Sequence, residues 1–146
     1  PADPNEPTNG WGIVSVGRSG RGIFHQTGGS FEGNTLKVAE YSNGYGAYML
    51  SGGSLDLHAY LYLVYGTASF GVSGSDIDHI TLNRFVPNNR RVNIELDENG
   101  STLINVVGTS SDRYNGARAN AYWQVGALSN FNAQVGDTYN IMWSAT

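Results

Sequence analysis

Apolar and polar residues alternate along most of this chain, in short segments separated by clusters of Gly, Asn, Ser and Asp. Alternation with a period of two is typical of a β-strand that buries one face. In residues 55–65 the odd positions hold leucines and an alanine up to position 63, and the even positions from 56 to 62 hold an acid, a histidine and two tyrosines. This segment is predicted to place one face in the core, while its other face is wetter and aromatic.

The same pattern predicts about ten short strands and very little helix, because no window of about twelve residues has a helical period. The clearest hairpin is RVNIELDENGSTLINVVG, which turns at Glu98-Asn99-Gly100-Ser101 and returns through Leu103 to Val107. With 55–65, the strand segments are 11–16, 22–26, 35–41, 45–51, 67–72, 77–86, 92–96, 103–107, 117–125 and 138–144.

Strands of this number and length predict an all-β fold, an antiparallel β-sandwich of the jelly-roll or Greek-key type. No repeat of about 20 to 50 residues is evident, which argues against a propeller or a solenoid. Residues 1–9, PADPNEPTN, contain three of the four prolines and are expected to form a linker from an upstream stalk or domain. Residues 10–146 are then a single β-sandwich binding domain.

Composition narrows the function classes. The 146 residues contain no cysteine, so the fold depends on packing and hydrogen bonds, without disulfides or a thiolate metal site. The net charge is −4, and Lys37 is the single lysine beside seven arginines, so nucleic acid is not an expected partner. No apolar run is long enough to span a membrane, and membrane insertion is not expected. Arginines in this excess suit a recognition surface.

Motifs for catalysis are missing from the sequence, and no cofactor or metal is expected. His25, His58 and His79 fall in three predicted strands, where a triad with Ser and Asp is one option and half-exposed sheet residues are the favoured one. Paired carboxylates leave a second option, a glycoside-acting enzyme on a β-sandwich. Its candidate carboxylates are Asp76, Asp78, Glu95 and Asp112.

Residues 17–22, GRSGRG, have two interpretations. A flexible backbone would let both arginines converge on a carboxylate or sulfate. The favoured interpretation is a glycine-rich hairpin loop with solvated arginines.

Two aromatic segments, 41–48 and 111–123, combine Tyr, Ser, Gly and Asn in the manner of binding surfaces. Sugars suit such surfaces, because a ring face stacks on an aromatic side chain while hydroxyls pair with Asn, Asp and Arg. Alternation in 117–125 places Trp123 in the core and Tyr122 on the opposite face. The candidate ligand-binding residues are Asn43, Tyr45, Asp112, Arg113, Tyr114, Asn115 and Arg118.

The segment LDENGSTL, residues 96–103, resembles the strand-turn-strand of adenovirus fibre heads, and the lead-in with Asp3-Pro4 resembles the hinge between their shaft and head. The resemblance implies a trimeric β-sandwich head on a fibrous stalk that binds a cell-surface protein or a sialylated glycan. Phage tail-fibre tips have a similar organisation.

These observations lead to one expected function, a non-catalytic, receptor- or glycan-binding head domain of a viral or phage fibre. The expected partner is a cell-surface glycan, sialylated or not, or a protein receptor, at the virion or phage surface or in a secreted setting. A homotrimer is expected to cover Tyr60, Tyr62 or Phe85, because large exposed apolar patches are costly. A coat or fibre protein without a ligand is the third alternative.

Overall fold

The computed structural model describes residues 12–71, 76–88, 90–97, 100–101, 104–107, 122–127, 134–138 and 141–144. Every regular element in these ranges is a β-strand, as the alternating pattern predicts. The strands are β1 (Ile13–Val16), β2 (Arg21–Val38), β3 (Tyr45–Leu63), β4 (Thr67–Phe70), β5 (Asp76–Val86), β6 (Arg91–Asp97), β7 (Gly100–Ser101), β8 (Ile104–Val106), β9 (Tyr122–Ala127) and β10 (Met142–Ser144).

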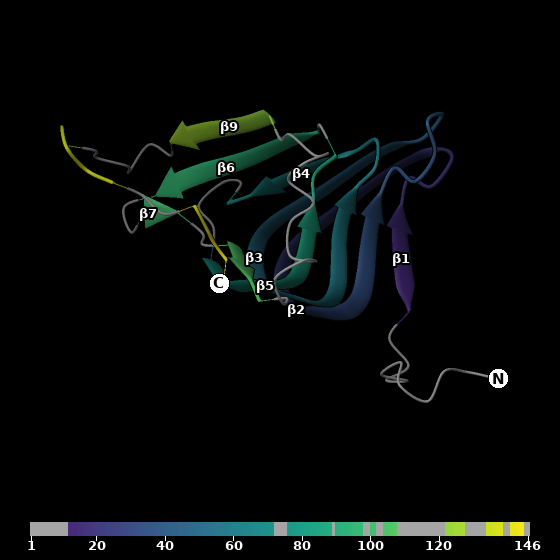
Figure 1. Ribbon diagram of the computed structural model, residues 1–146, viewed down its shortest axis with the longest axis horizontal. Helices are drawn as coiled ribbons and strands as arrows, with labels where there is room; N and C mark the ends of the chain where they lie inside the picture. Colours follow the sequence, from purple (N-terminus) through teal and green to yellow (C-terminus); the bar gives the residue numbers. More distant parts are fainter. Residues whose placement is uncertain are drawn as a thin grey trace.

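The strands pair in parallel, with β6 and β7 as the antiparallel exception among the described residues. The chain winds as a parallel β-solenoid, so the prediction of an antiparallel β-sandwich, and the argument against a solenoid, are wrong. Positions 13, 35, 60 and 84 are equivalent in successive turns, which are therefore of nearly constant length. The strands that follow extend the stack (Figure 1).

Each turn contributes one strand segment to each of three faces. Face A consists of 13–16, 35–38, 60–63 and 84–86. Face B consists of 21–26, 45–50, β4, β6 and β9, and face C consists of 30–33, 54–57, 79–82, β8 and β10. In Figure 1 the face B strands β4, β6 and β9 lie across the direction of β1 and of the arrowheads with which β2, β3 and β5 end on face A.

Apolar side chains of equivalent positions stack on one another inside the solenoid. Leu36, Leu61 and Phe85 form one such column on face A, and all three are fully buried. Corresponding buried columns on faces B and C contain Leu50, Phe70 and Ile94, and Leu55, Ile80 and Ile104. The alternation in the sequence therefore predicts correctly that these apolar residues face the core. The strands, however, have different pairing partners from those in a sandwich.

The bends between faces explain why the antiparallel prediction failed. Two segments expected as separate strands, 22–26 and 35–41, both contribute to β2, which ends at Val38. In the same way 45–51 and 55–65 both contribute to β3, which ends at Leu63. Glycine-rich bends, TGGS at 27–30 and SGGS at 51–54, turn the chain through a corner without reversing it. Gly29 and Gly53 adopt positive φ angles of 68° and 78° there, which favours glycine. A glycine-rich segment alone does not distinguish a corner from a hairpin.

The Asn-Gly hairpin is confirmed over the residues that the structure describes. Leu96 pairs with Ser101 and Asp97 with Gly100 in antiparallel register. The expected return strand to Val107 does not continue the hairpin, because β8 pairs in parallel with β5 and β10. This short hairpin is an excursion at the end of β6.

The structure also bears on the expected trimer interface and on membrane spans. Phe85 is fully buried in the chain's own core, so it does not need a trimer to cover it, whereas Tyr60 and Tyr62 are half-buried. In the described ranges no helix has the length and hydropathy needed to cross a bilayer.

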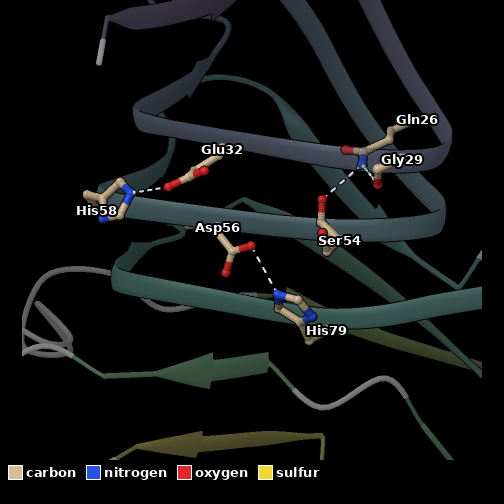
Figure 2. Close-up of polar contacts among 7 residues, drawn as sticks. All are labelled: Gln26, Gly29, Glu32, Ser54, Asp56, His58 and His79. Carbon is tan, nitrogen blue, oxygen red and sulfur yellow. Dashed lines mark hydrogen bonds and ion pairs between the residues drawn. The ribbon is translucent and has the colours of Figure 1, made fainter. Parts of the chain in front are cut away.

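The side chain of Gln26 holds the corner between faces B and C together through hydrogen bonds to backbone carbonyl groups. Its side-chain amide donates to the carbonyl oxygens of Gly29, at 3.1 Å, and Ser54, at 2.9 Å, as Figure 2 shows. Its Oε1 accepts a 2.8 Å hydrogen bond from the hydroxyl of buried Tyr48. Every polar atom of this buried amide side chain therefore has a partner, which is what burial of such a group requires.

Burial also raises the pKa of the Tyr48 phenol well above its usual value. In the unfolded chain this phenol ionises near pH ~10. Its contribution to the free energy of unfolding is therefore intact below about pH 10 and is lost progressively as the pH rises toward the folded-state pKa. In an absorbance titration of the tyrosines, the Tyr48 phenol should resist ionisation until the chain unfolds.

Tyr48→Phe should remove the resistant phenol from this titration, and Tyr122→Phe, at an exposed position, should leave it in place. If all the tyrosines of the parent protein ionise together while it is still folded, Tyr48 is not isolated from water.

Candidate functional site

The corner where each turn passes from face A to face B has a series of tyrosines and arginines along the solenoid axis. In register, Arg21 lies opposite Tyr45, and the guanidinium carbon of Arg21 lies 5.4 Å from the centroid of the Tyr45 ring. One turn later Tyr65 has Arg90 above its ring at 4.8 Å. The backbone N–H of Tyr122 donates to the carbonyl of Arg90 at 3.0 Å. We call Arg21, Tyr45, Tyr65, Arg90, Arg91 and Tyr122 the corner ladder.

The ladder's tyrosines keep much of their surface in solvent. Their exposed fractions are 52% for Tyr45, 43% for Tyr65 and 69% for Tyr122. Stacked parallel strands lie ~4.8 Å apart, so side chains at equivalent positions form a regular row. In the order of the turns, the corner ladder presents Arg21, then Tyr45 and Tyr65, then Arg90 and Arg91, and last Tyr122.

Two open grooves adjoin the ladder on face B and share Arg91. The first, of about 450 Å³, is lined by Tyr65, Gly66, Thr67, Arg90, Arg91 and Tyr122. The second, of about 390 Å³, has Asn93 and Gln124 among its polar lining residues, with Glu95 as its carboxylate. The Nδ2 of Asn93 donates to Ser69 Oγ at 2.8 Å, whereas its Oδ1 is buried and has no partner among the described residues. Aromatic, cationic and amide groups thus converge on one surface.

A third Arg–Tyr pair at this corner joins Arg18, between β1 and β2, to Tyr41, between β2 and β3. Arg18 lies 5.5 Å from the Tyr41 ring and donates to the Tyr41 hydroxyl at 3.2 Å. Arg18 also forms a 3.0 Å ion pair with Glu40. The hydrogen bond from Lys37 to Glu40, together with Ser15 and Arg18, holds the pKa of that carboxyl below its usual value. The Arg18 charge is therefore already compensated within the chain.

Face C carries a different set of polar pairs between turns, shown in Figure 2. His58 Nε2 lies 3.0 Å from Glu32 Oε1, and His79 Nε2 lies 3.0 Å from Asp56 Oδ2. Asp56 and His58 line a smaller open groove of about 270 Å³ with Thr81 and Asn83. Both histidines are about half exposed, as the favoured interpretation of the sequence predicts.

These pairs do not form the triad that the sequence left open. His25 contacts Ser51 Oγ at 2.8 Å but no carboxylate among the described residues, and His79 contacts a carboxylate but no serine there. Among the described residues, no group of three or more potential ligands lies close enough to hold a metal ion. On face C the histidines join neighbouring turns to one another.

Of the ligand-binding residues predicted from the sequence, some lie in the described part of the structure and others do not. Tyr45 belongs to the corner ladder, and Asn43 is exposed in the turn before it. Trp123 packs against the core, as predicted, and contacts Phe85 edge to face, with ring centroids 6.1 Å apart. The other five candidates, Asp112, Arg113, Tyr114, Asn115 and Arg118, lie outside the described residues.

The enzyme alternative depends on paired carboxylates. Glu95 lies on β6 and lines the second groove, where no other described carboxylate joins it. Asp76 and Asp78 lie on β5, which does not pair with β6, and Asp112 lies outside the described residues. The described strands therefore do not bring Glu95 next to Asp76 or Asp78.

Sequence reasoning missed Arg21, Tyr65, Arg90, Arg91 and Tyr122 as members of one surface. The loop at 17–22, interpreted as a hairpin loop, is a corner, because β1 pairs in parallel with 35–38 and not with 21–26. One signal in the sequence could have revealed this surface. Each arginine and the tyrosine ring that it covers are separated along the chain by about one turn of the solenoid, as are Arg21 and Tyr45, or Tyr65 and Arg90.

Comparison with known proteins adds no further assignment: no family model, curated protein or solved structure matches this chain. The class of protein that the fold defines is the parallel β-solenoid.

Proposed function

We propose that this protein is a recognition module that binds acidic glycans along the corner ladder. The observation that carries the proposal is the pair of adjoining grooves on face B, which share Arg91 and combine exposed tyrosines with arginine and amide groups. An extended, open groove suits a chain of sugars, because each ring can stack on an aromatic side chain while its hydroxyls meet amides.

Charge supports an acidic ligand. The whole chain has a net charge of −4, yet four of its seven arginines, Arg18, Arg21, Arg90 and Arg91, lie at this one corner. Among the described residues, only Arg18 of these four is in an ion pair with a carboxylate. Arginine presents a planar fork that binds a carboxylate or sulfate through two hydrogen bonds.

The exposed tyrosines support a sugar rather than a simple anion. Tyr65 and Tyr122 line the same groove, with Arg90 and Arg91 between them. A free inorganic anion would gain little from aromatic walls, whereas a sugar ring gains contact area from them. Attachment to a virus or phage fibre, and the homotrimer, stay predictions.

Replacing Arg91 should weaken acidic glycan binding without unfolding the protein. Loss of a charge-assisted pair costs about 1.5–3 kcal/mol, or roughly ten- to a hundredfold in affinity. Arg91→Ala is expected to lose that much affinity for an oligogalacturonide, measured by calorimetry. Arg91→Lys should lose less, because it keeps the charge but not the fork. The melting temperature should stay close to that of the parent, because Arg91 is exposed.

Two controls make this experiment decisive. Arg18→Ala removes an exposed arginine that Glu40 already neutralises, and it should change affinity less than Arg91→Ala. The methyl-esterified oligogalacturonide has the same sugar backbone without the charge and should bind weakly. Equal binding of both oligosaccharides, or of neither, would contradict the proposal.

A further inference from the structure

Faces B and C of the solenoid begin on the same turn and also end on the same turn. Faces B and C each contain five stacked strand segments among the described residues. Face B begins at 21–26 and ends at β9, and face C begins at 30–33 and ends at β10. Because both faces begin and end on the same turn, one translation along the axis would bring both pairs of edges together.

The first turn leaves apolar surface and backbone open. Ile13 is 61% exposed, Val14 38% and Ile23 57%. A Cβ built on Gly28 or Gly29 would meet nothing within 4 Å, although one built on Gly53, one turn later, would meet backbone. Segment 21–26 pairs with β3 on one side, and no described strand pairs with its other side. Within the part of the chain that the structure describes, this end of the stack therefore has an unpaired strand edge.

The last turn is open in the same way. Val125, whose column contains buried Leu50, Phe70 and Ile94, is 52% exposed. β9 pairs with β6, and none of the described strands pairs with its outer edge. The apolar column therefore ends at an exposed valine, on a strand whose outer edge has no described partner. Such a surface resembles a core from which the next layer of strands has been removed.

We propose that a second copy of this chain supplies the next layer, with its segment 21–26 pairing in parallel with β9 of the first copy. The side-chain columns match in this arrangement. Tyr122, on the outward side, would meet Ile23, and the inward Trp123 would meet Phe24. On face C, Met142 would meet Phe31, and both already pack against the core cluster.

Parallel pairing between two copies requires head-to-tail contact. Two copies of the same edge can meet only with their strands antiparallel, whereas the last edge of one copy and the first edge of the next continue the parallel ladder. Such a heterologous contact does not close on itself when the copies are related by translation, and it builds a linear assembly. The corner ladder would continue across the joint, because Tyr122 of one copy would approach Arg21 of the next.

A pair of variants tests this proposal, each blocking one end with a buried charge. Val14→Glu blocks the first turn, and Val125→Glu blocks the last turn. In sedimentation velocity the parent protein should show a mass that rises with concentration, and each variant alone should be a monomer. A mixture of the two should form a 1:1 dimer, because each supplies the end that the other lacks. Circular dichroism of both variants should match that of the parent.

Val107→Glu is the matched control, since Val107 is a 44% exposed valine next to β8, one turn before the last. It should assemble like the parent. A parent protein that is monomeric at every concentration, or that stops at a fixed trimer, would overturn the proposal. It would also be overturned if the mixed variants fail to dimerise. None of these measurements involves a glycan, so they are independent of the proposed binding function.

Discussion

Gly53→Ala is expected to destabilise the protein far more than Gly29→Ala, although both glycines have positive φ angles at equivalent bends. A Cβ on Gly29 would meet nothing within 4 Å. A Cβ on Gly53 would overlap the Gly29 carbonyl oxygen and would lie 2.7 Å from the carbonyl carbon of Gly28. Since these are backbone atoms of the preceding turn, no side-chain rotation relieves the overlap.

Comparison of Gly29→Ala with Gly53→Ala separates the cost of the backbone conformation from the cost of the steric overlap. Gly29→Ala should cost about 1–2 kcal/mol, the usual penalty for a left-handed L-residue. Gly53→Ala carries the same penalty plus overpacking of about 1–3 kcal/mol, and its total approaches the whole stability of a marginal domain. Urea unfolding of both variants measures the difference. Similar midpoints would show that successive bends do not touch as closely as the structure places them.

Phe85→Ala should be the most destabilising change in the core, at about 3–5 kcal/mol. Phe85 is fully buried, ends the face A column above Leu61 and contacts Trp123 on face B. Its loss therefore opens a cavity between two faces. Chemical denaturation followed by circular dichroism should show a lower midpoint with an unchanged slope.

Phe85→Leu fills part of the space and should cost much less than Phe85→Ala. Tyr62→Ala, at a half-buried position on the same face, is the surface control. If Phe85→Ala and Tyr62→Ala destabilise the protein equally, Phe85 is not a core residue.

The side of each strand that faces the core could be predicted from the sequence, whereas the strand partners could not. Alternation depends on the direction of neighbouring side chains, so Leu55, Leu57 and Leu61 are buried in a sandwich and in a solenoid alike. Strand pairing depends on what each bend does. TGGS and SGGS permit either a reversal or a corner, and only their recurrence at the same position of successive turns indicates a solenoid.

The candidate site shows the same limit. Tyr45 was identified by its local composition, because Tyr, Asn and Gly cluster around it. Arg90, Arg91 and Tyr122 belong to no such cluster, and their proximity exists only because successive turns stack. A site assembled from one residue per turn has no local signature, and it is found only once the turn length is known.

The nearly constant length of the turns makes the molecule modular in one dimension. Among the described strands, each turn pairs with the turns before and after it, so stability is approximately a sum of turns and of the contacts between neighbours. Duplication of one turn would leave the cross-section unchanged and lengthen the corner ladder by one rung. Gain or loss of single turns would therefore lengthen or shorten the proposed glycan-binding surface without redesign of the core.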